Sequence, residues 1–266
     1  MLSQDQVAHF QTFGFVTLPQ VFTAAERKII DTEYETGLNL AYQQIPFTGE
    51  KRHWTMMLGP ETPFFSGLPE APRFCDVAEQ LYGEDVFAVG CDANRYVGDS
   101  AWHPDHNADP TKDCYGIKIA FYLDPVDEQS GALRVIPGSH RNPMHEAVRE
   151  NLPAMELGIN AVPAHVCVSE PGDAVAFDLR LWHASWGGDE GRRMCTVVYY
   201  KNPVTPAEQA ATRNRATSSQ KAPAQYERPD DPLYSPHWVA NHSGSEKRRG
   251  WLERLKEFGF IDSVAA

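Results

Sequence analysis

Ile117-Lys118-Ile119-Ala120-Phe121-Tyr122-Leu123 is the central piece of the fold prediction. Successive side chains of a β-strand point to opposite faces, so Lys118 is expected to share a face with Ala120 and Tyr122, opposite three large apolar residues. Four other short β-rich runs accompany this one, and turn residues separate them. They are Val86 to Gly90, Leu133 to Ile136, Ala174 to Leu181 and Met194 to Tyr200. This spacing predicts a sandwich or barrel of antiparallel strands between about residues 86 and 201.

Helices are predicted before this region. Ser3 and Thr23 each place a hydroxyl at a helix start, with Gln or Glu three residues later, which is a capping box. Between the two helices, Gly14 to Leu18 alternates like a short strand. A third helix is expected from Pro72 to Tyr82, because apolar residues recur at helical spacing and Gly83 follows as a stop signal.

The region after the strands is predicted to be less regular. Residues 202–245 are rich in Pro, Ala, Gln, Asn and Ser, so we expect a long loop or lid. A closing helix is expected at about residues 245–260, with Trp251, Leu252 and Leu255 on its inner face. The runs at 174–181 and 194–200 are expected to form a strand pair joined by the loop Gly187-Gly188-Asp189-Glu190-Gly191. We expect one domain over residues 1–266.

Composition narrows the classes of protein. The 266 residues are 42% hydrophobic, enough for a substantial core, and the formal net charge of -12 argues against a nucleic-acid partner. Residues 1–15 lack a secretion signal, and no run reaches the roughly 18 apolar residues of a membrane span. Five cysteines occur without a CxxC pair, which indicates small core residues rather than a zinc site or disulfides. A cytoplasmic protein without a membrane partner is expected.

Two separated motifs suggest a metal site. In Trp102-His103-Pro104-Asp105, His103 and Asp105 share one side of an extended segment. Much later, Leu181-Trp182-His183-Ala184-Ser185 supplies a second imidazole. Two histidines and one carboxylate on one face of a metal are typical of non-haem Fe(II) oxygenases, which keep the other face open. Each motif alone is weak, since HxD is common by chance and a lone histidine near a strand end is more often a surface or hydrogen-bonded residue than a ligand.

His106 offers a competing interpretation. With His103 it forms HxxH, which faintly resembles the HxHxDH motif of dinuclear hydrolases. The first histidine of that motif would fall at residue 101, which is Ala101. The mononuclear site therefore fits better, with His106 behind the ligands or facing solvent.

Three motifs in order resemble the phytanoyl-CoA dioxygenase family of Fe(II)/2-oxoglutarate oxygenases. The first is Trp102 to Asp105. The second is Ser130-Gly131-Ala132-Leu133-Arg134-Val135-Ile136-Pro137-Gly138-Ser139-His140, where we expect a structural turn and no iron ligand. The third runs from Pro171-Gly172-Asp173 to His183-Ala184-Ser185 and Arg192. The opening pattern of Phe10, Gly14-Phe15-Val16 and the helix near Thr23 is similar too, so the resemblance spans about residues 3–201.

The resemblance implies a mainly β fold, a double-stranded β-helix (a cupin-like jelly roll) with N-terminal helices and a C-terminal helix around it. His103, Asp105 and His183 would bind Fe(II), and 2-oxoglutarate would be the co-substrate with O2. Arg192 would bind the distal carboxylate of 2-oxoglutarate, because a planar guanidinium makes two parallel bonds to a carboxylate. Arg193 is the fallback, and an ordinary surface pair of arginines is the alternative. Ser185 resembles the serine that helps hold 2-oxoglutarate.

Lys118 is a third candidate for cofactor binding, because its strand face could line the barrel and reach a carboxylate; a solvated lysine is the alternative. Asn94 and Tyr96 are weaker candidates of the same kind. The substrate walls are expected from residues 43–65, including Arg52 and His53, and from residues 202–245. Arg52 and His53 could bind an anionic group or lie at the surface. The lid's aromatic candidates are Tyr226, Tyr234 and Trp238.

The expected function is oxidation of an unactivated C–H bond of a small molecule, most simply hydroxylation, with succinate and CO2 as co-products. Related halogenases replace the carboxylate ligand by a small residue, so Asp105 favours hydroxylation over halogenation. Two alternatives remain at this stage. A cupin-like isomerase or lyase would use the same ligands without Arg192, and a non-catalytic sensor would need no iron.

Overall fold

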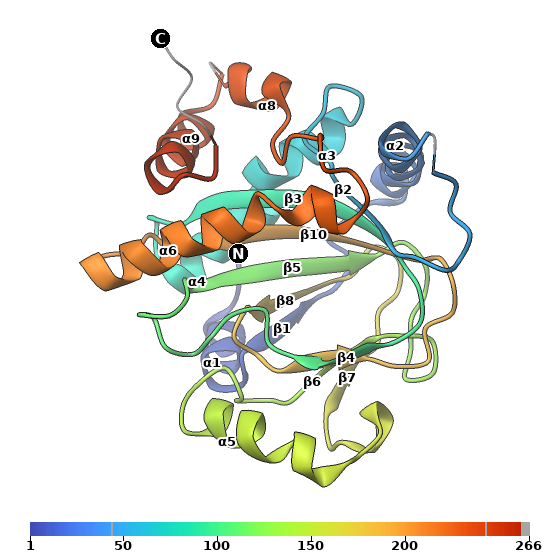
Figure 1. Cartoon of the computed structure of the whole chain (residues 1–266), viewed down its shortest axis with the longest axis vertical. Helices are drawn as coiled ribbons and strands as arrows, with labels where there is room; N and C mark the ends of the chain where they lie inside the picture. The colour runs from blue at the N-terminus through green and yellow to red at the C-terminus, as the bar shows by residue number, and fades with distance from the viewer. Residues whose placement is uncertain (44, 243, 262–266) are drawn as a thin grey trace.

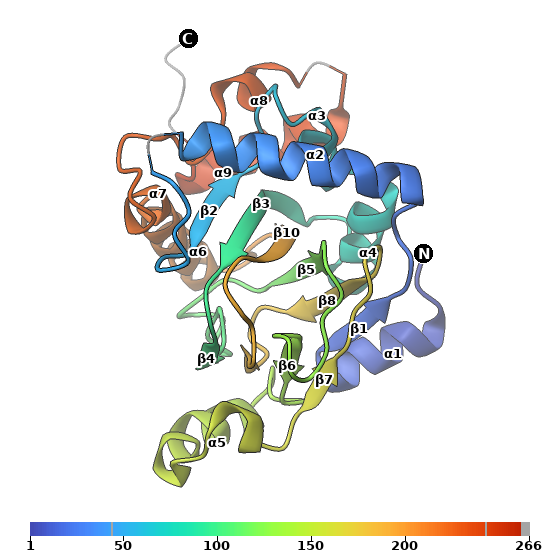
Figure 2. The same cartoon turned by 90° about the vertical axis from the view of Figure 1, so that its right-hand side faces the viewer.

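Two antiparallel sheets face each other in the computed structural model, which describes residues 1–43, 45–242 and 244–261 (Figures 1 and 2). The larger sheet has the order β1-β8-β5-β10-β3-β2, and the smaller has β4-β9-β6-β7. This arrangement is a double-stranded β-helix, which confirms the predicted fold. The strands are β1 (Phe15–Leu18), β2 (His53–Met56), β3 (Phe87–Tyr96), β4 (Ser100–His103), β5 (Gly116–Tyr122), β6 (Leu133–Val135), β7 (His165–Cys167), β8 (Ala174–Asp178), β9 (His183–Ser185) and β10 (Arg192–Tyr200).

Helices flank the sheets. Most of them lie outside the larger sheet, while α5 lies beside the smaller sheet (Figures 1 and 2). No helix in the described ranges has the length and apolar character needed to cross a membrane. The helices are α1 (Gln4–Phe13), α2 (Ala24–Ala41), α3 (Pro63–Gly67), α4 (Pro72–Tyr82), α5 (Met144–Asn151), α6 (Pro206–Ser219), α7 (Ala222–Gln225), α8 (Pro236–Ala240) and α9 (Glu246–Phe258), with short 3-10 turns at Leu68–Glu70, Pro153–Met155 and Ile159–Ala161.

The predicted helix signals act as expected. The capping boxes at Ser3 and Thr23 both form, so each hydroxyl accepts a bond from the backbone N–H three residues on. Helix α4 begins at Pro72 and ends at Tyr82, and it is followed by Gly83, whose φ of 94° lies in the region that favours glycine. Local side-chain chemistry therefore sets where these helices begin and end.

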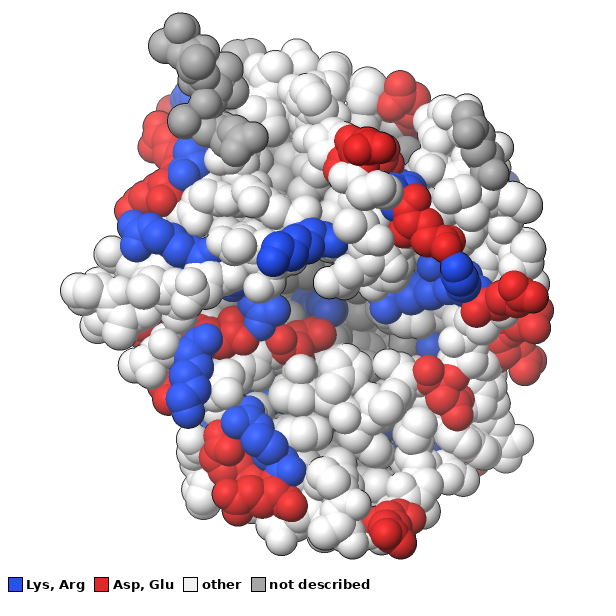
Figure 3. Space-filling view, in the orientation of Figure 1, with Lys and Arg blue, Asp and Glu red and all other residues white. Residues whose placement is uncertain are grey.

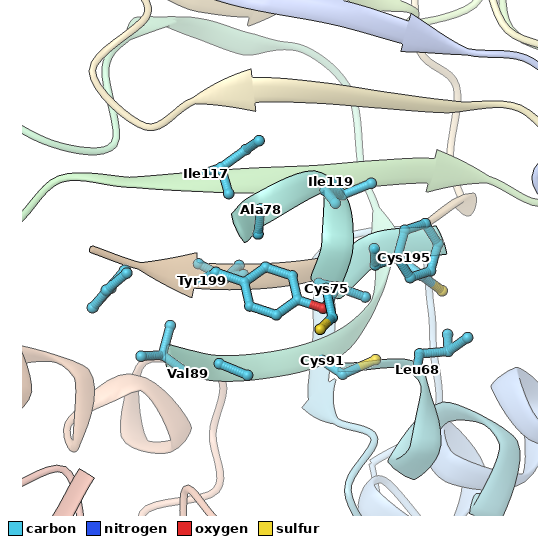
Figure 4. Close-up of a cluster of buried hydrophobic side chains, with 14 of the residues drawn as sticks. Leu68, Cys75, Ala78, Val89, Cys91, Ile117, Ile119, Cys195 and Tyr199 are labelled. Atoms are coloured by element: carbon cyan, nitrogen blue, oxygen red, sulfur yellow. The ribbon is translucent and has the colours of Figure 1, made fainter. Parts of the chain in front are cut away.

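The main apolar core lies between the larger sheet and the helices outside it, and Figure 4 shows part of it around Tyr199. Ile117 and Ile119 of β5 face this core. The Phe121 ring packs against Phe22, with ring centroids 4.8 Å apart. The opposite face of β5 turns toward the space between the sheets, as the alternation predicted.

Two predictions were wrong: the pairing of two strands and the lack of regular structure after the last strand. Strands β8 and β10 do not pair; β8 lies between β1 and β5, and the glycine-rich loop connects β9 of the smaller sheet to β10 of the larger one. The segment predicted as a loop or lid contains α6, α7 and α8. Its abundant alanine and glutamine permit helix, and Thr205 caps α6 with another capping box.

Candidate active site

A cavity of about 290 Å³ lies between the two sheets. Figure 3 shows a hollow near the middle of this face, with basic atoms recessed inside it. Strands from both sheets and helix α7 supply its walls, so residues far apart in the sequence meet there. Its lining includes Arg52, Trp54, Asp92, Asn94, Tyr96, His103, Asp105, Lys118, Tyr122, Leu133, Phe177, His183, Ser185, Arg192, Thr196 and Tyr226.

The structure brings the three predicted metal-binding side chains together at one wall of this cavity. His103 and His183 are register partners on β4 and β9. Nε2 of His103 lies 3.9 Å from Oδ1 of Asp105, and Nε2 of His183 lies 4.0 Å from Oδ2. All three donors lie within 4.8 Å of one another. Two donors that each sit about 2.1 Å from one ion can be at most roughly 4.2 Å apart, so the carboxylate can share an ion with either imidazole.

Backbone contacts orient both imidazoles. Nδ1 of His103 lies 2.7 Å from the carbonyl of Ala101, and Nδ1 of His183 lies 2.8 Å from the carbonyl of Leu181. A carbonyl can only accept, so each Nδ1 carries a proton, which leaves each Nε2 as the ring nitrogen that could bind a metal. Burial lowers the pKa of His183 to about 4, so this ring is neutral at pH 7, as a metal ligand must be.

Lys118 contacts the carboxylate of this group. Its Nζ lies 2.7 Å from Oδ2 of Asp105. Burial alone would raise the pKa of Asp105, but the charge of Lys118 outweighs it and holds that pKa well below its usual range. Asp105 is therefore ionised at neutral pH. Lys118 lines the cavity with Tyr122, which confirms that this face of β5 points inward.

Arg192 lies in the cavity with unused hydrogen-bonding capacity. Its Nη2 donates to Oγ of Ser185 at 2.9 Å, while its buried Nε and Nη1 have no hydrogen-bond partner among the residues the structure describes. Gly131 and Gly188 make room for it, since a Cβ added at either would lie 1.7 Å from Nη1. A buried guanidinium with free N–H groups is costly unless an anion completes it, and a carboxylate has the matching fork geometry.

Arg193 points the other way. Its guanidinium bonds Asp124 at 2.6 Å and Asp31 at 3.0 Å on the outside of the larger sheet. Alternation along β10 separates the two arginines, so only Arg192 is available inside the cavity. Of the two arginines, Arg192 is thus the one that could bind a ligand in this cavity.

The cavity also contains polar residues that were not predicted from the sequence, or were predicted without a definite place in the site. Arg52 lines it, whereas His53 is buried and stacks on Tyr42 with ring centroids 3.7 Å apart. Asp92 was missed, although it shares an alternating face of β3 with Asn94 and could have been found by that period. Of the aromatic candidates, Tyr226 lines the cavity, while Tyr234 and Trp238 lie in the main core.

Helix α6 supports the carboxylate from behind. Arg215 pairs with Asp113, and its Nη2 also donates to the backbone carbonyl of Asp105 at 3.1 Å. His106, which is buried, lies in the same region and contacts the carbonyl of Cys114 through Nδ1 at 2.6 Å. His106 is thus behind the cavity wall rather than solvent facing, and Arg215 was not singled out from the sequence.

A jelly roll with a His-Asp-His group in its cavity defines the class of cupin-like non-haem metal proteins. Comparison with known proteins makes this specific. The family model described as phytanoyl-CoA dioxygenase (PhyH) matches residues 10–194. The chain is similar to dioxygenase af480 of Aspergillus fumigatus, with 24% identity over 75% of this chain and 67% of that protein. It is also similar to the ectoine dioxygenase of Bordetella bronchiseptica, with 26% identity over 53% of this chain and 50% of that protein.

Among solved structures, EvdO2 of Micromonospora carbonacea var. aurantiaca, complexed with 2-oxoglutarate, has the same fold. Its TM-score is 0.56 and its identity 21%, over 78% of this chain and 96% of that one. The chain therefore belongs to the phytanoyl-CoA dioxygenase family. It is a 2-oxoglutarate-dependent non-haem iron dioxygenase, with Fe(II), 2-oxoglutarate and O2 as its cofactors and oxidant. The match spans about half the length of the ectoine dioxygenase.

Proposed function

We propose that this protein hydroxylates an unactivated C–H bond of a small-molecule substrate, with His103, Asp105 and His183 as the iron ligands. Arg192 and Ser185 would bind the distal carboxylate of 2-oxoglutarate. The observation that carries the proposal is the pairing of two features in one cavity. A three-donor group lies at one wall, and a buried guanidinium with two unpartnered nitrogens lies in the same space.

The free N–H groups of Arg192 argue against the alternatives. An isomerase or lyase that used the same metal ligands without 2-oxoglutarate would not need a buried cation beside Ser185. A dicarboxylate co-substrate does, because one carboxylate can bind the metal while the other makes charge-assisted bonds to Arg192. The donor set of two imidazoles and one carboxylate suits Fe(II).

The bound metal would supply oxygen activation, and the protein's own residues would position and protect the reactants. Lys118 keeps Asp105 ionised and orients its Oδ2. The ring of Phe177, whose centroid lies 5.0 Å from that of His183, gives the wall near the histidines an apolar surface, and Leu133 adds apolar surface beside Ser185; both limit water there. Because Asp105 fills the carboxylate position, hydroxylation is favoured over chloride transfer.

We also infer that residues 1–266 act as one oxygenase domain, since β2 near the start and α7 near the end both contribute to this cavity. The volume of about 290 Å³ must hold 2-oxoglutarate and the substrate, which restricts the substrate to a small molecule. The relatives named as dioxygenases of small molecules, such as ectoine dioxygenase, are consistent with that size.

The test is an anaerobic titration with Fe(II) and 2-oxoglutarate, read as the weak visible charge-transfer band of the ternary complex. His103→Ala and His183→Ala should remove iron binding. Arg192→Ala should retain iron and weaken 2-oxoglutarate binding, while its neighbour Arg193→Ala is the matched control and should leave both unchanged. Absence of the band in the unaltered protein, together with no affinity for 2-oxoglutarate, would contradict the proposal.

A further inference from the structure

The end of the cavity near β2 and β3 contains a guanidinium, that of Arg52, and a carboxylate, that of Asp92, which do not pair with each other. Arg52 directs Nε at 3.0 Å and also Nη2 to Oδ1 of Asn94. The amide nitrogen of Asn94 in turn donates to Oδ1 of Asp92 at 2.5 Å. The side chain of Asn94 therefore stands between a guanidinium and a carboxylate that would otherwise neutralise each other.

Arg52 has donors left over. Two of its five N–H groups point to Asn94, and no carboxylate oxygen among the described residues lies within 4.0 Å of its nitrogens. Its guanidinium lies 4.0 Å from the ring centroid of Tyr96 and 5.3 Å from that of Tyr226. These rings hold the guanidinium in place without cancelling its charge, so its free edge suits an oxyanion of the ligand.

Asp92 has acceptors left over in the same way. Its oxygens accept from Asn94 and from Oγ1 of Thr196 at 2.9 Å, and both donors are neutral. A carboxylate accepts about four hydrogen bonds, so roughly two positions remain. No Lys, Arg or His nitrogen in the described part of the chain lies within 4.0 Å of it. Burial raises the pKa of Asp92 more than the charges of Lys118 and Arg52, neither of which is in direct contact, lower it, so a cation bound directly to this carboxyl would stabilise its charge.

The other charges of the cavity already have partners. Lys118 bonds Asp105, and Arg192 fits the distal carboxylate of 2-oxoglutarate. The charges that remain without a partner are the positive charge of Arg52 and the negative charge of Asp92, and the side-chain amide of Asn94 lies between them. A neutral ligand would leave both charges desolvated and unpaired, which would weaken its binding.

We propose that the substrate is a small zwitterion of the amino-acid type, whose carboxylate binds Arg52 and whose protonated amine binds Asp92. This inference rests on the proposed function, because the rest of the molecule must extend toward His103 and His183 for its C–H bond to be oxidised. Asn94 acts as a positioning residue that keeps the two charges apart. Trp54 and Tyr226, whose rings stack 5.2 Å apart, form the apolar wall beside them.

The experiment uses the full chain loaded with Fe(II) and 2-oxoglutarate and measures succinate formation. The probes are three matched sets. Each contains an amino acid (valine, leucine or proline), its methyl ester, which lacks the anionic charge, and the corresponding acid without the amine. We expect at least one amino acid to accelerate succinate formation, with kcat/KM at least about 10-fold above its ester and its amine-free acid.

Variants assign the two charges. Arg52→Gln should raise KM for the amino acid and lower the ratio of its kcat/KM to that of its methyl ester. Asp92→Asn, which keeps the shape of the side chain, should lower the ratio of kcat/KM for the amino acid to that for its amine-free acid. Lys51→Gln is the matched control. Lys51 pairs with Glu227 at the surface, so this substitution should alter neither ratio of kcat/KM.

The two hypotheses can fail separately. If the unaltered protein shows no charge-transfer band with Fe(II) and 2-oxoglutarate, the proposed function itself is wrong. If the band forms, the zwitterion inference is overturned by esters or amine-free acids matching the amino acids. It is equally overturned if no amino acid in the three sets accelerates succinate formation.

Discussion

Gly188→Ala tests whether the space around Arg192 is built for a dicarboxylate. A Cβ at residue 188 would lie 1.7 Å from Nη1 and 2.8 Å from Cζ of Arg192. Ordinary contact begins at 3.4 Å, so Nη1 must withdraw by about 1.7 Å. Because Nη1 is at the far end of a flexible side chain, it can move, and the fold should tolerate the added methyl group. The displaced Nη1, however, should no longer be in place to bind 2-oxoglutarate.

The expected loss follows from hydrogen-bond geometry. A charge-assisted bond of about 2.8 Å that lengthens by roughly 1.7 Å is broken. One such bond to a charged group contributes about 1.5–3 kcal/mol, which corresponds to a Kd for 2-oxoglutarate that is roughly 10- to 150-fold higher. Iron binding should not change, since residue 188 does not line the wall of His103 and His183.

The assay is the anaerobic titration of the Fe(II) protein with 2-oxoglutarate, accompanied by a thermal melt. Gly250→Ala is the matched control, because a Cβ there meets no atom within 4 Å. If the Gly188→Ala protein folds and binds 2-oxoglutarate as tightly as the unaltered protein, then Arg192 is not the group that holds the distal carboxylate.

Three further predictions concern other parts of the structure. The hydrogen bond from Arg73 lowers the pKa of Glu26 to about 2, so the ionised carboxylate stabilises the fold above pH 4.5, and this contribution is lost as the pH falls toward 2. Glu26→Gln should therefore cost about 1–2 kcal/mol at pH 7, because solvent partly screens the pair, and less at pH 3.5; urea unfolding at both values checks this. Arg215→Leu removes the bond to the Asp105 carbonyl and should weaken Fe(II) binding about 10-fold in an anaerobic metal titration, and unchanged affinity would contradict the supporting role of α6. Phe121→Ala should lower the free energy of unfolding by about 3–5 kcal/mol, since its ring is almost fully buried, and a loss below 1 kcal/mol in urea would mean that the core closes around the gap.

Local features could be read from the sequence because their causes are local. The hydroxyls of Ser3 and Thr23 cap helices through bonds to residues three positions away. The stretch around Lys118 alternates because each side chain of a strand points opposite to the next. The helices of residues 206–240 were missed since their composition is compatible with loop and helix alike, and packing against the rest of the chain makes the choice.

What the sequence alone determined is the chemical inventory and the local elements: an HxD pair, a distant histidine, a serine two residues on, and two adjacent arginines. Only the tertiary structure decided which of these meet. The pairing of β4 with β9 places His103 beside His183, and the strand face of β10 sends Arg192 inward and Arg193 outward. It also sets Asn94 between Arg52 and Asp92. Contacts of this kind depend on which strands become neighbours, and that depends on the burial of the whole apolar core rather than on any short stretch of chain.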